Sequence, residues 1–209
     1  MQAVFLDRDG VIGVNRVDHV KSWDEFQFIP GALAALRWLH EAGLHTFVVT
    51  NQAIVNRGIV SPEIIEDMHS RMHQQIRQHG GLITDIVYCP HDTAEACACR
   101  KPQPGMLSGL AAKWGVDLAR SYMVGDAWTD IAAGRRATCR TILVQTGRGN
   151  QQMHLPELRQ HPADLLAADL SGAVEWIVQR EGFAAPATER IGHQRVPSAA
   201  WVGTLQVGG

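Results

Sequence analysis

Aspartates stand directly after short apolar segments at two places far apart in the sequence. Asp7 and Asp9 follow residues 3–6, and Asp126 follows residues 122–125. Carboxylate oxygens are preferred ligands of Mg²⁺, which commonly binds one or two carboxylates together with a substrate phosphate. A carboxylate beside such a metal can attack phosphorus and form an aspartyl-phosphate. These positions therefore predict metal-assisted phosphoryl transfer, with Asp7 as the attacking group.

A hydroxyl and an ammonium group follow two further apolar segments. Thr50 comes directly after one of them, and Lys101 follows the other after a loop. Both can bind the oxygens of a transferring phosphoryl group, and such electrostatic positioning carries most of phosphoryl-transfer catalysis. Asp9 could protonate the leaving oxygen and later activate water. An Asp-x-Asp-Gly sequence alone is common in turns, but four such features in order, each after an apolar segment, favour an active site.

Residues 89–101, which we call the cysteine loop, contain three thiols and one imidazole. The four residues are Cys89, His91, Cys97 and Cys99. A set of three cysteines and one histidine is a common tetrahedral zinc site, and a site with four protein ligands is structural rather than catalytic. We therefore expect a structural Zn²⁺ that holds this polar loop and the neighbouring Lys101. Reduced, unliganded cysteines or a disulfide are the alternatives.

Segments that suit strands alternate with segments that suit helices along most of the chain. Ser61-Pro62 is a favourable helix start, and Gly43 is a favourable residue just after a helix. This alternation predicts an α/β fold with a mostly parallel sheet and helices on both faces, whose active site lies at the carboxyl ends of the strands. The expected strands are 3–6, 45–49, 85–88, 122–124, 141–144 and 163–170, and the expected helices are 32–42, 62–79, 104–114, 127–136 and 171–180.

Composition and charge exclude several classes of protein. The chain has 209 residues, 45% hydrophobic and 19% charged, with a formal net charge of -2. Nucleic-acid-binding proteins usually carry a basic excess, so we expect no nucleic-acid partner. No apolar segment approaches membrane-spanning length and no signal-peptide pattern is present, so we expect no membrane partner and a cytoplasmic protein, either a monomer or a weak oligomer. We expect one domain over residues 1–182, followed by an extension or tail over 183–209.

Four segments, taken together, resemble the motifs of the haloacid-dehalogenase superfamily. They are Phe5-Leu6-Asp7-Arg8-Asp9-Gly10, Val49-Thr50-Asn51-Gln52, Arg100-Lys101-Pro102 and Val124-Gly125-Asp126-x-x-x-Asp130. The resemblance covers residues 3 to about 150. It implies a Rossmann-like sheet and a Mg²⁺-dependent phosphatase.

The resemblance also implies a role for each matched residue. Asp7 would be the nucleophile, and Asp9 the general acid and base. The side chains of Asp7 and Asp126 and the main-chain carbonyl of Asp9 would hold Mg²⁺. Thr50 and Lys101 would stabilise the transferring phosphoryl group. A non-catalytic, zinc-stabilised binding module is a remote alternative, which the presence of all five residues disfavours.

The cysteine loop resembles the zinc loop of one branch of this superfamily, which contains heptose-bisphosphate and histidinol phosphatases. That branch carries Cys-Pro-His followed by Cys-x-Cys-Arg-Lys-Pro, as residues 89–102 do here. The stretch between Gly10 and Thr50 is too short for a separate cap domain, so we expect an open site. The resemblance implies a sugar phosphate as substrate, with heptose 1,7-bisphosphate as the leading candidate. Histidinol phosphate, or another sugar or polyol phosphate, is the alternative.

Polar residues beside the motifs are candidates for substrate binding. Arg57 lies seven residues after Thr50, and Arg100 directly precedes Lys101. Arginine binds phosphate through two parallel hydrogen bonds, so these residues suit a substrate with a second phosphate. We assign Asn51, Gln52, Arg57 and Arg100 to substrate binding. The sequence gives Asp130 and Arg148 no definite role.

Overall fold

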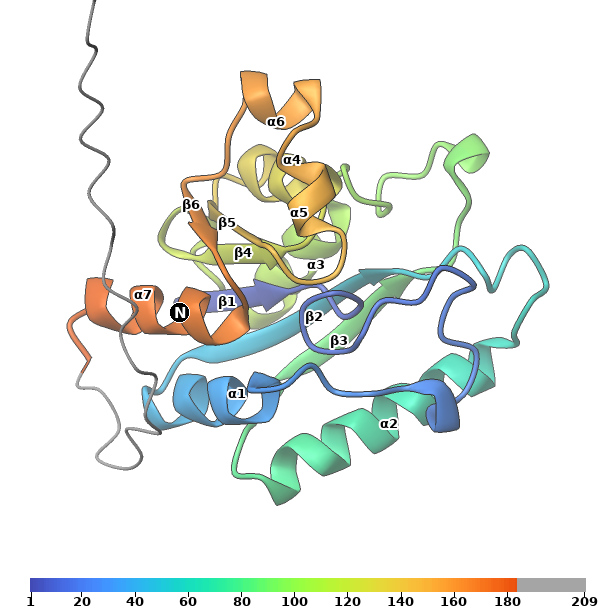
Figure 1. The fold of residues 1–209 in the computed structure, drawn as a ribbon, viewed down its shortest axis with the longest axis horizontal. Coiled ribbons are helices and arrows are strands. Elements are labelled where there is room, and N and C mark those ends of the chain that lie inside the picture. Colours follow the sequence, from blue (N-terminus) through green and yellow to red (C-terminus); the bar gives the residue numbers. More distant parts are fainter. Residues whose placement is uncertain (184–209) are drawn as a thin grey trace, which may run out of the picture.

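A single parallel sheet organises the part of the chain that the computed structural model describes, residues 1–183 (Figure 1). All neighbouring strands in it run parallel, and the order across the sheet is β3-β2-β1-β4-β5-β6. The order reverses beside β1, and in open α/β sheets such a switch point places ligands at the carboxyl ends of the strands. The strands are β1 (Ala3–Leu6), β2 (His45–Asn51), β3 (Asp85–Cys89), β4 (Tyr122–Gly125), β5 (Arg140–Val144) and β6 (Leu165–Ala167).

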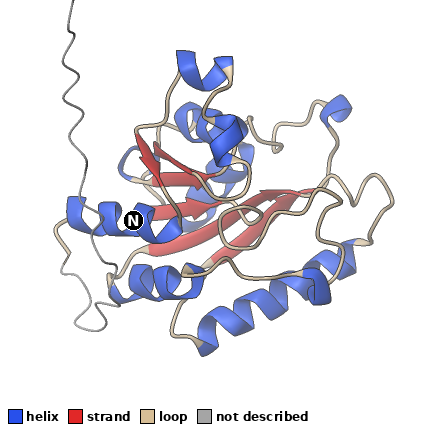
Figure 2. Cartoon of the chain, viewed as in Figure 1, coloured by secondary structure: helices blue, strands red, loops and turns tan. Residues whose placement is uncertain are grey.

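Helices cover both faces of this sheet, as the alternating sequence pattern predicts (Figure 2). The helices are α1 (Ala32–Glu41), α2 (Pro62–Gln78), α3 (Gly105–Trp114), α4 (Trp128–Arg136), α5 (Gly149–Gln152), α6 (Pro156–Gln160) and α7 (Leu170–Arg180), with single 3-10 turns at η1 (Trp23–Glu25), η2 (Thr93–Glu95) and η3 (Leu118–Arg120).

Alternating side chains of β1 divide the core into two layers. Val4 and Leu6 join the apolar cluster formed with α1, α2 and α7, whereas Ala3 and Phe5 join the cluster formed with α3 and α4. Successive side chains of a strand point to opposite faces, so a strand buried on both faces is apolar throughout, as β1 is. Both layers bury β1 completely, which makes it a rigid support for the residues that follow it.

The expected strand at 163–170 is shorter in the structure, where it spans Leu165–Ala167 and is flanked by two aspartates whose side chains bind backbone groups. The Asp164 carboxylate accepts hydrogen bonds from the backbone N–H and the hydroxyl of Thr141, at 2.7 and 2.8 Å. Asp169 accepts from the backbone N–H of Gly172 at 2.9 Å and caps the start of α7. Asp169 is thus the first residue of the helix cap and belongs to the connection between β6 and α7. The remaining expected elements are present with small differences at their ends, whereas the short helices η1, η2, η3, α5 and α6 were not predicted.

The connection between β1 and α1 contains a loop and η1 rather than a separate cap domain, in agreement with the sequence prediction. An isolated bridge joins Gly13 to Phe28 and closes the loop. The Phe28 ring also makes edge-to-face contacts with Trp23 and Phe26. Residues 184–209, which contain nearly all of the predicted extension, lie outside the described part of the chain. Among residues 1–183, no helix has both the length and the apolarity needed to cross a membrane.

Candidate active site

Three aspartates meet at the carboxyl edge of the sheet. Asp7 follows β1 and Asp126 follows β4, and these strands are neighbours, so the two side chains converge. Asp130, on the first turn of α4, joins them, and the three residues each offer a carboxylate oxygen within 4.8 Å of the others. All three are buried, with exposed fractions of 5%, 0% and 1%. Asp7 and Asp126 are thus brought together as the sequence predicted, and Asp130 is an additional member.

Lys101 supplies the positive charge at the centre of this group. Its ammonium nitrogen lies 2.8 Å from Asp7 Oδ1 and 2.6 Å from Asp130 Oδ1, and it donates a 2.7 Å hydrogen bond to the Val49 carbonyl. Burial alone would lower the pKa of Lys101, but the charges of Asp130 and Asp7 outweigh burial and raise it. The ammonium group therefore stays protonated although it is almost inaccessible to water.

Negative charge nevertheless exceeds positive charge in this group. Burial raises the pKa of Asp7 to about 6, and it raises the pKa of Asp126 and Asp130 as well. Three carboxylates face the ammonium of Lys101 and, at the outer side, the guanidinium of Arg148. Buried anions need a compensating cation, and a donor set made only of oxygen suits Mg²⁺. The residues present therefore fit the metal that the sequence resemblance implies.

Two glycines allow the backbone to approach the Asp126 carboxylate closely. A Cβ atom at Gly10 would lie 2.1 Å from Asp126 Oδ2, and one at Gly147 would lie 2.3 Å from the same oxygen. Both glycines have positive φ angles, which residues with side chains rarely adopt. The backbone N–H of Arg148 donates a 2.8 Å hydrogen bond to Asp126 Oδ2, and its guanidinium lies 3.4 Å from Oδ1. Asp126 is therefore held firmly, and Arg148 is a residue of the site that the sequence left without a role.

The Asp9 carboxylate belongs to a separate group beside the three aspartates. Arg8 donates two hydrogen bonds to it, from Nε to Oδ1 at 3.1 Å and from Nη2 to Oδ2 at 2.8 Å. Gln52 Nε2 donates a third, at 2.9 Å, and also lies 2.9 Å from Thr50 Oγ1. Burial alone would raise the pKa of Asp9, but Arg8 and Gln52 outweigh it and hold that pKa below its ordinary value.

Asn51 and Gln52 contact the predicted catalytic residues directly. The Asn51 side chain accepts from the Lys101 backbone N–H and donates to the Lys101 carbonyl, both at 3.0 Å. Gln52 bridges Thr50 and Asp9, as described above. These hydrogen bonds give both residues a positioning role. Their predicted contacts with substrate stay predictions.

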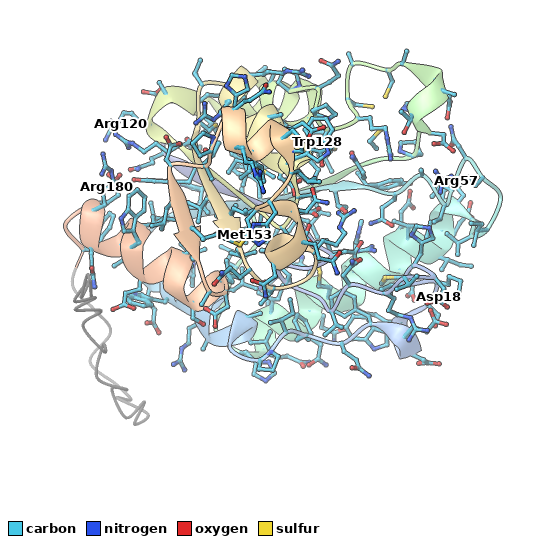
Figure 3. The ribbon with its side chains drawn as sticks, turned by 45° about the horizontal axis from the view of Figure 1, so that its top comes forward. Asp18, Arg57, Arg120, Trp128, Met153 and Arg180 are labelled. Atoms are coloured by element: carbon cyan, nitrogen blue, oxygen red, sulfur yellow. The ribbon has the colours of Figure 1, made fainter. Side chains whose placement is uncertain are left out.

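Arg57 and Arg100 both bind residues of the cysteine loop, to which Arg100 itself belongs. Arg57 pairs with the Asp92 carboxylate through two hydrogen bonds of 2.7 and 3.0 Å, and Arg100 donates to the His91 carbonyl at 3.0 Å. Figure 3 shows Arg57 at the periphery of the molecule, and 42% of its side chain is exposed. Substrate binding by either arginine stays a prediction, and for Arg57 it would require competition with Asp92.

The four predicted zinc ligands gather in one cluster. Cys89 Sγ lies 3.6 Å from Cys97 Sγ and 3.5 Å from His91 Nδ1, and Cys99 Sγ lies 3.2 to 3.3 Å from the other three atoms. Four mutually close donors of this kind match the tetrahedral set that zinc prefers. The cluster is adjacent in sequence to Lys101. Contacts among the four donors, which close the loop, therefore also restrain Lys101.

The chain matches known proteins along most of its length. The HAD-hydrolase-like family model matches residues 98–173. A relative from Pseudomonas aeruginosa, named D-glycero-beta-D-manno-heptose-1,7-bisphosphate 7-phosphatase, is 40% identical over 73% of this chain and 86% of its own length. This chain belongs to the heptose-bisphosphate phosphatase branch of the haloacid-dehalogenase-like hydrolases. The family resemblance drawn from the sequence is confirmed.

Other relatives support the same branch. A Thermosynechococcus vestitus protein named D-glycero-D-manno-heptose-1,7-bisphosphate 7-phosphatase is 38% identical over 84% of this chain and 94% of its own length. The crystal structure of the heptose 1,7-bisphosphate phosphatase of Bordetella bronchiseptica, complexed with magnesium and phosphate, superposes with a TM-score of 0.79. It is 36% identical and covers 86% of this chain and 99% of its own. The similarity to this branch therefore covers most of the chain and is not confined to the motifs.

Replacing Lys101 with Met is expected to destabilise the fold. The change leaves buried carboxylates without their ammonium partner, and breaking a buried ion pair costs about 3–5 kcal/mol. Urea unfolding without added metal would measure the loss in the free energy of unfolding. The deficit should grow as the pH rises from about 4 to about 7, because Asp7, whose pKa is raised, then loses its proton in the native state.

Lys113→Met is the matched control for this change. Lys113 pairs with Asp85 at 2.7 Å, but 63% of its side chain is exposed. Exposed ion pairs contribute less than about 1 kcal/mol, so the control should remain close to the wild type at each pH. Equal losses for the two variants would contradict the central role of Lys101.

Proposed function

We propose that this protein is a Mg²⁺-dependent phosphatase that removes the 7-phosphate of D-glycero-D-manno-heptose 1,7-bisphosphate. The observation that carries the proposal is the buried group of Asp7, Asp126, Asp130 and Lys101 at the carboxyl edge of the sheet. The names of the relatives in the same branch support the substrate. The connection between β1 and α1 contains no cap domain, which supports an open site for a sugar with two phosphates.

The chemistry begins with attack by a carboxylate oxygen of Asp7 on the phosphorus atom. The bond between phosphorus and the sugar oxygen breaks, and Asp9 transfers a proton to that oxygen. Thr50 and Lys101 bind the oxygens of the transferring group and hold it in line with Asp7. The negative substrate phosphate favours the protonated form of Asp9, since like charges disfavour ionisation.

A water molecule completes the reaction. Asp9, now deprotonated, takes a proton from the water, whose oxygen attacks the phosphorus of the aspartyl-phosphate. The bond to Asp7 breaks and inorganic phosphate leaves. Asp7, Asp126 and the main-chain carbonyl of Asp9 would hold Mg²⁺, which would supply the positive charge that lets two anions approach each other.

We also propose that the cysteine loop binds a structural Zn²⁺ through Cys89, His91, Cys97 and Cys99. The mutual closeness of these four donors supports this assignment. The Arg100 hydrogen bond to the His91 carbonyl ties the ligand set to the residue before Lys101. The cytoplasmic location and the monomeric or weakly oligomeric state remain predictions from the sequence.

Replacing Asp7 with Asn is expected to lower kcat by at least about 10³-fold, because the amide cannot act as the nucleophile. Phosphate release in the presence of Mg²⁺ would measure the change. Asp67→Asn is a matched control, since Asp67 lies on α2, is exposed and pairs only with Arg71 among the ion pairs of residues 1–183. Equal activity of wild type and Asp7→Asn would contradict the role of Asp7 as nucleophile. No phosphate release by the wild type from any phosphate ester, together with no measurable effect of Asp7→Asn, would favour the non-catalytic module.

A comparison of substrates tests the sugar assignment. We expect kcat/KM for heptose 1,7-bisphosphate to exceed that for histidinol phosphate by about 100-fold or more, because a site built for polar contacts rejects a ligand that leaves them unmade. Phosphorus NMR of the product should show that the phosphate at position 1 remains. A preference for histidinol phosphate, or for fructose 1,6-bisphosphate, would overturn the heptose assignment while leaving the phosphatase assignment intact.

Metal analysis of freshly purified, reduced protein should find about one zinc per chain, as four-ligand structural sites bind one ion. Cys97→Ser is expected to lose the zinc and to lower the melting temperature. Cys139→Ala is the matched control, because Cys139 is buried, directly precedes β5 and lies outside the cluster of four donors. Zinc-free wild-type protein with full activity would refute the assignment.

A further inference from the structure

Arg8 is a wholly buried arginine between the two aspartates of the first motif. Its exposed fraction is 0%, and it is among the largest fully buried side chains of the described chain. A guanidinium group has only donors, and each buried donor needs an acceptor. Two of its nitrogens, Nε and Nη2, donate to the Asp9 carboxylate. The third, Nη1, lies 3.2 Å from Nε2 of His69.

His69 must therefore accept this hydrogen bond. It lies on α2, sixty-one positions away from Arg8 in sequence, and is 7% exposed. Burial, together with the charge of Arg8, lowers the pKa of His69 to about 3, so its ring is neutral at physiological pH. A neutral imidazole has one nitrogen that accepts, and the contact with Arg8 assigns that role to Nε2.

The groups packed against His69 keep its ring in this orientation. The Tyr88 ring, on β3, contacts it edge to face with ring centroids 5.8 Å apart. The charges that act on the ring are those of Arg8 and Asp9. His69 is thus fixed by α2 and β3, and Arg8 is fixed between His69 and Asp9. Gln52 holds the same carboxylate at Oδ2.

We propose that His69 is a positioning residue for proton transfer by Asp9. By accepting the hydrogen bond from Arg8 Nη1, it sets the plane of the guanidinium, and the guanidinium sets the plane of the Asp9 carboxylate. Loss of the acceptor leaves a buried donor unsatisfied, so the guanidinium turns and the carboxylate turns with it. The inference deepens the proposed function and rests on it, since it requires Asp9 to be the general acid.

The way in which the rate of the first turnover depends on the leaving group separates this positioning role from a merely structural one. An alkyl phosphate releases an alkoxide, which needs the proton of Asp9, whereas p-nitrophenyl phosphate releases a stable phenolate that does not. The first turnover isolates this step from the later hydrolysis of the aspartyl-phosphate. The experiment therefore measures release of alcohol from a sugar phosphate, and of p-nitrophenol from p-nitrophenyl phosphate, in the first turnover of the Mg²⁺-loaded protein.

Three variants of His69 and one control make the comparison. His69→Leu removes the acceptor, and His69→Gln restores one near the position of Nε2. His69→Asn keeps an amide that is too short to reach Arg8, and it replaces the leucine variant if that variant does not fold. His73→Leu is the matched control, one turn further along α2, and the melting temperature of each variant is recorded.

We expect alcohol release to fall at least about tenfold in His69→Leu or His69→Asn, while p-nitrophenol release changes less than about threefold, since general acid catalysis contributes about 10²–10⁴-fold in total. His69→Gln should recover most of the loss, and His73→Leu should resemble the wild type. Equal losses with both substrates, no loss with either, or the same loss in His73→Leu would overturn the inference. A wild-type protein that releases neither product would instead show failure of the proposed function, and the inference would fall with it.

Discussion

One buried ammonium group among buried carboxylates is the interaction on which the site depends. Lys101 lies within ion-pair distance of Asp7 and Asp130, and water reaches none of the three freely. Removing these charges from water is costly, and their mutual attraction compensates only if the geometry is held closely. The surrounding structure can therefore be understood as the means of holding one lysine and several aspartates at fixed separations.

Three independent restraints hold Lys101. Its ammonium group donates to the carbonyl of Val49 on β2, and Asn51 binds both polar groups of its backbone. The cysteine loop closes on itself immediately before it. One set of restraints comes from β2, and the other comes from the loop that follows β3. Because β2 and β3 are neighbouring strands, the lysine moves with the sheet. The cysteine and histidine cluster and Lys101 are therefore adjacent both in sequence and in the structure.

The two aspartates of the first motif lie in different environments. Asp7 faces other carboxylates, and burial raises its pKa to about 6. Asp9, two residues later, faces Arg8 and Gln52, which hold its pKa below the ordinary value despite burial. Arg8 contributes most to the lowering of the Asp9 pKa, and the proposed role of His69 follows from the need to hold Arg8.

The sequence by itself determined the alternation of strands and helices, the four motifs and the cysteine loop, because apolar periodicity and the spacing of reactive residues are local properties. It also placed Asp7, Asp126 and Lys101 at one edge, since parallel strands bring their carboxyl ends together. Only the tertiary structure decided that Asn51 binds Lys101 and Gln52 binds Thr50, that Arg57 pairs with Asp92, and that His69 contacts Arg8. Those contacts depend on the packing of α2 and of two loops against the sheet, and no local pattern specifies which side chains such packing brings within hydrogen-bond distance.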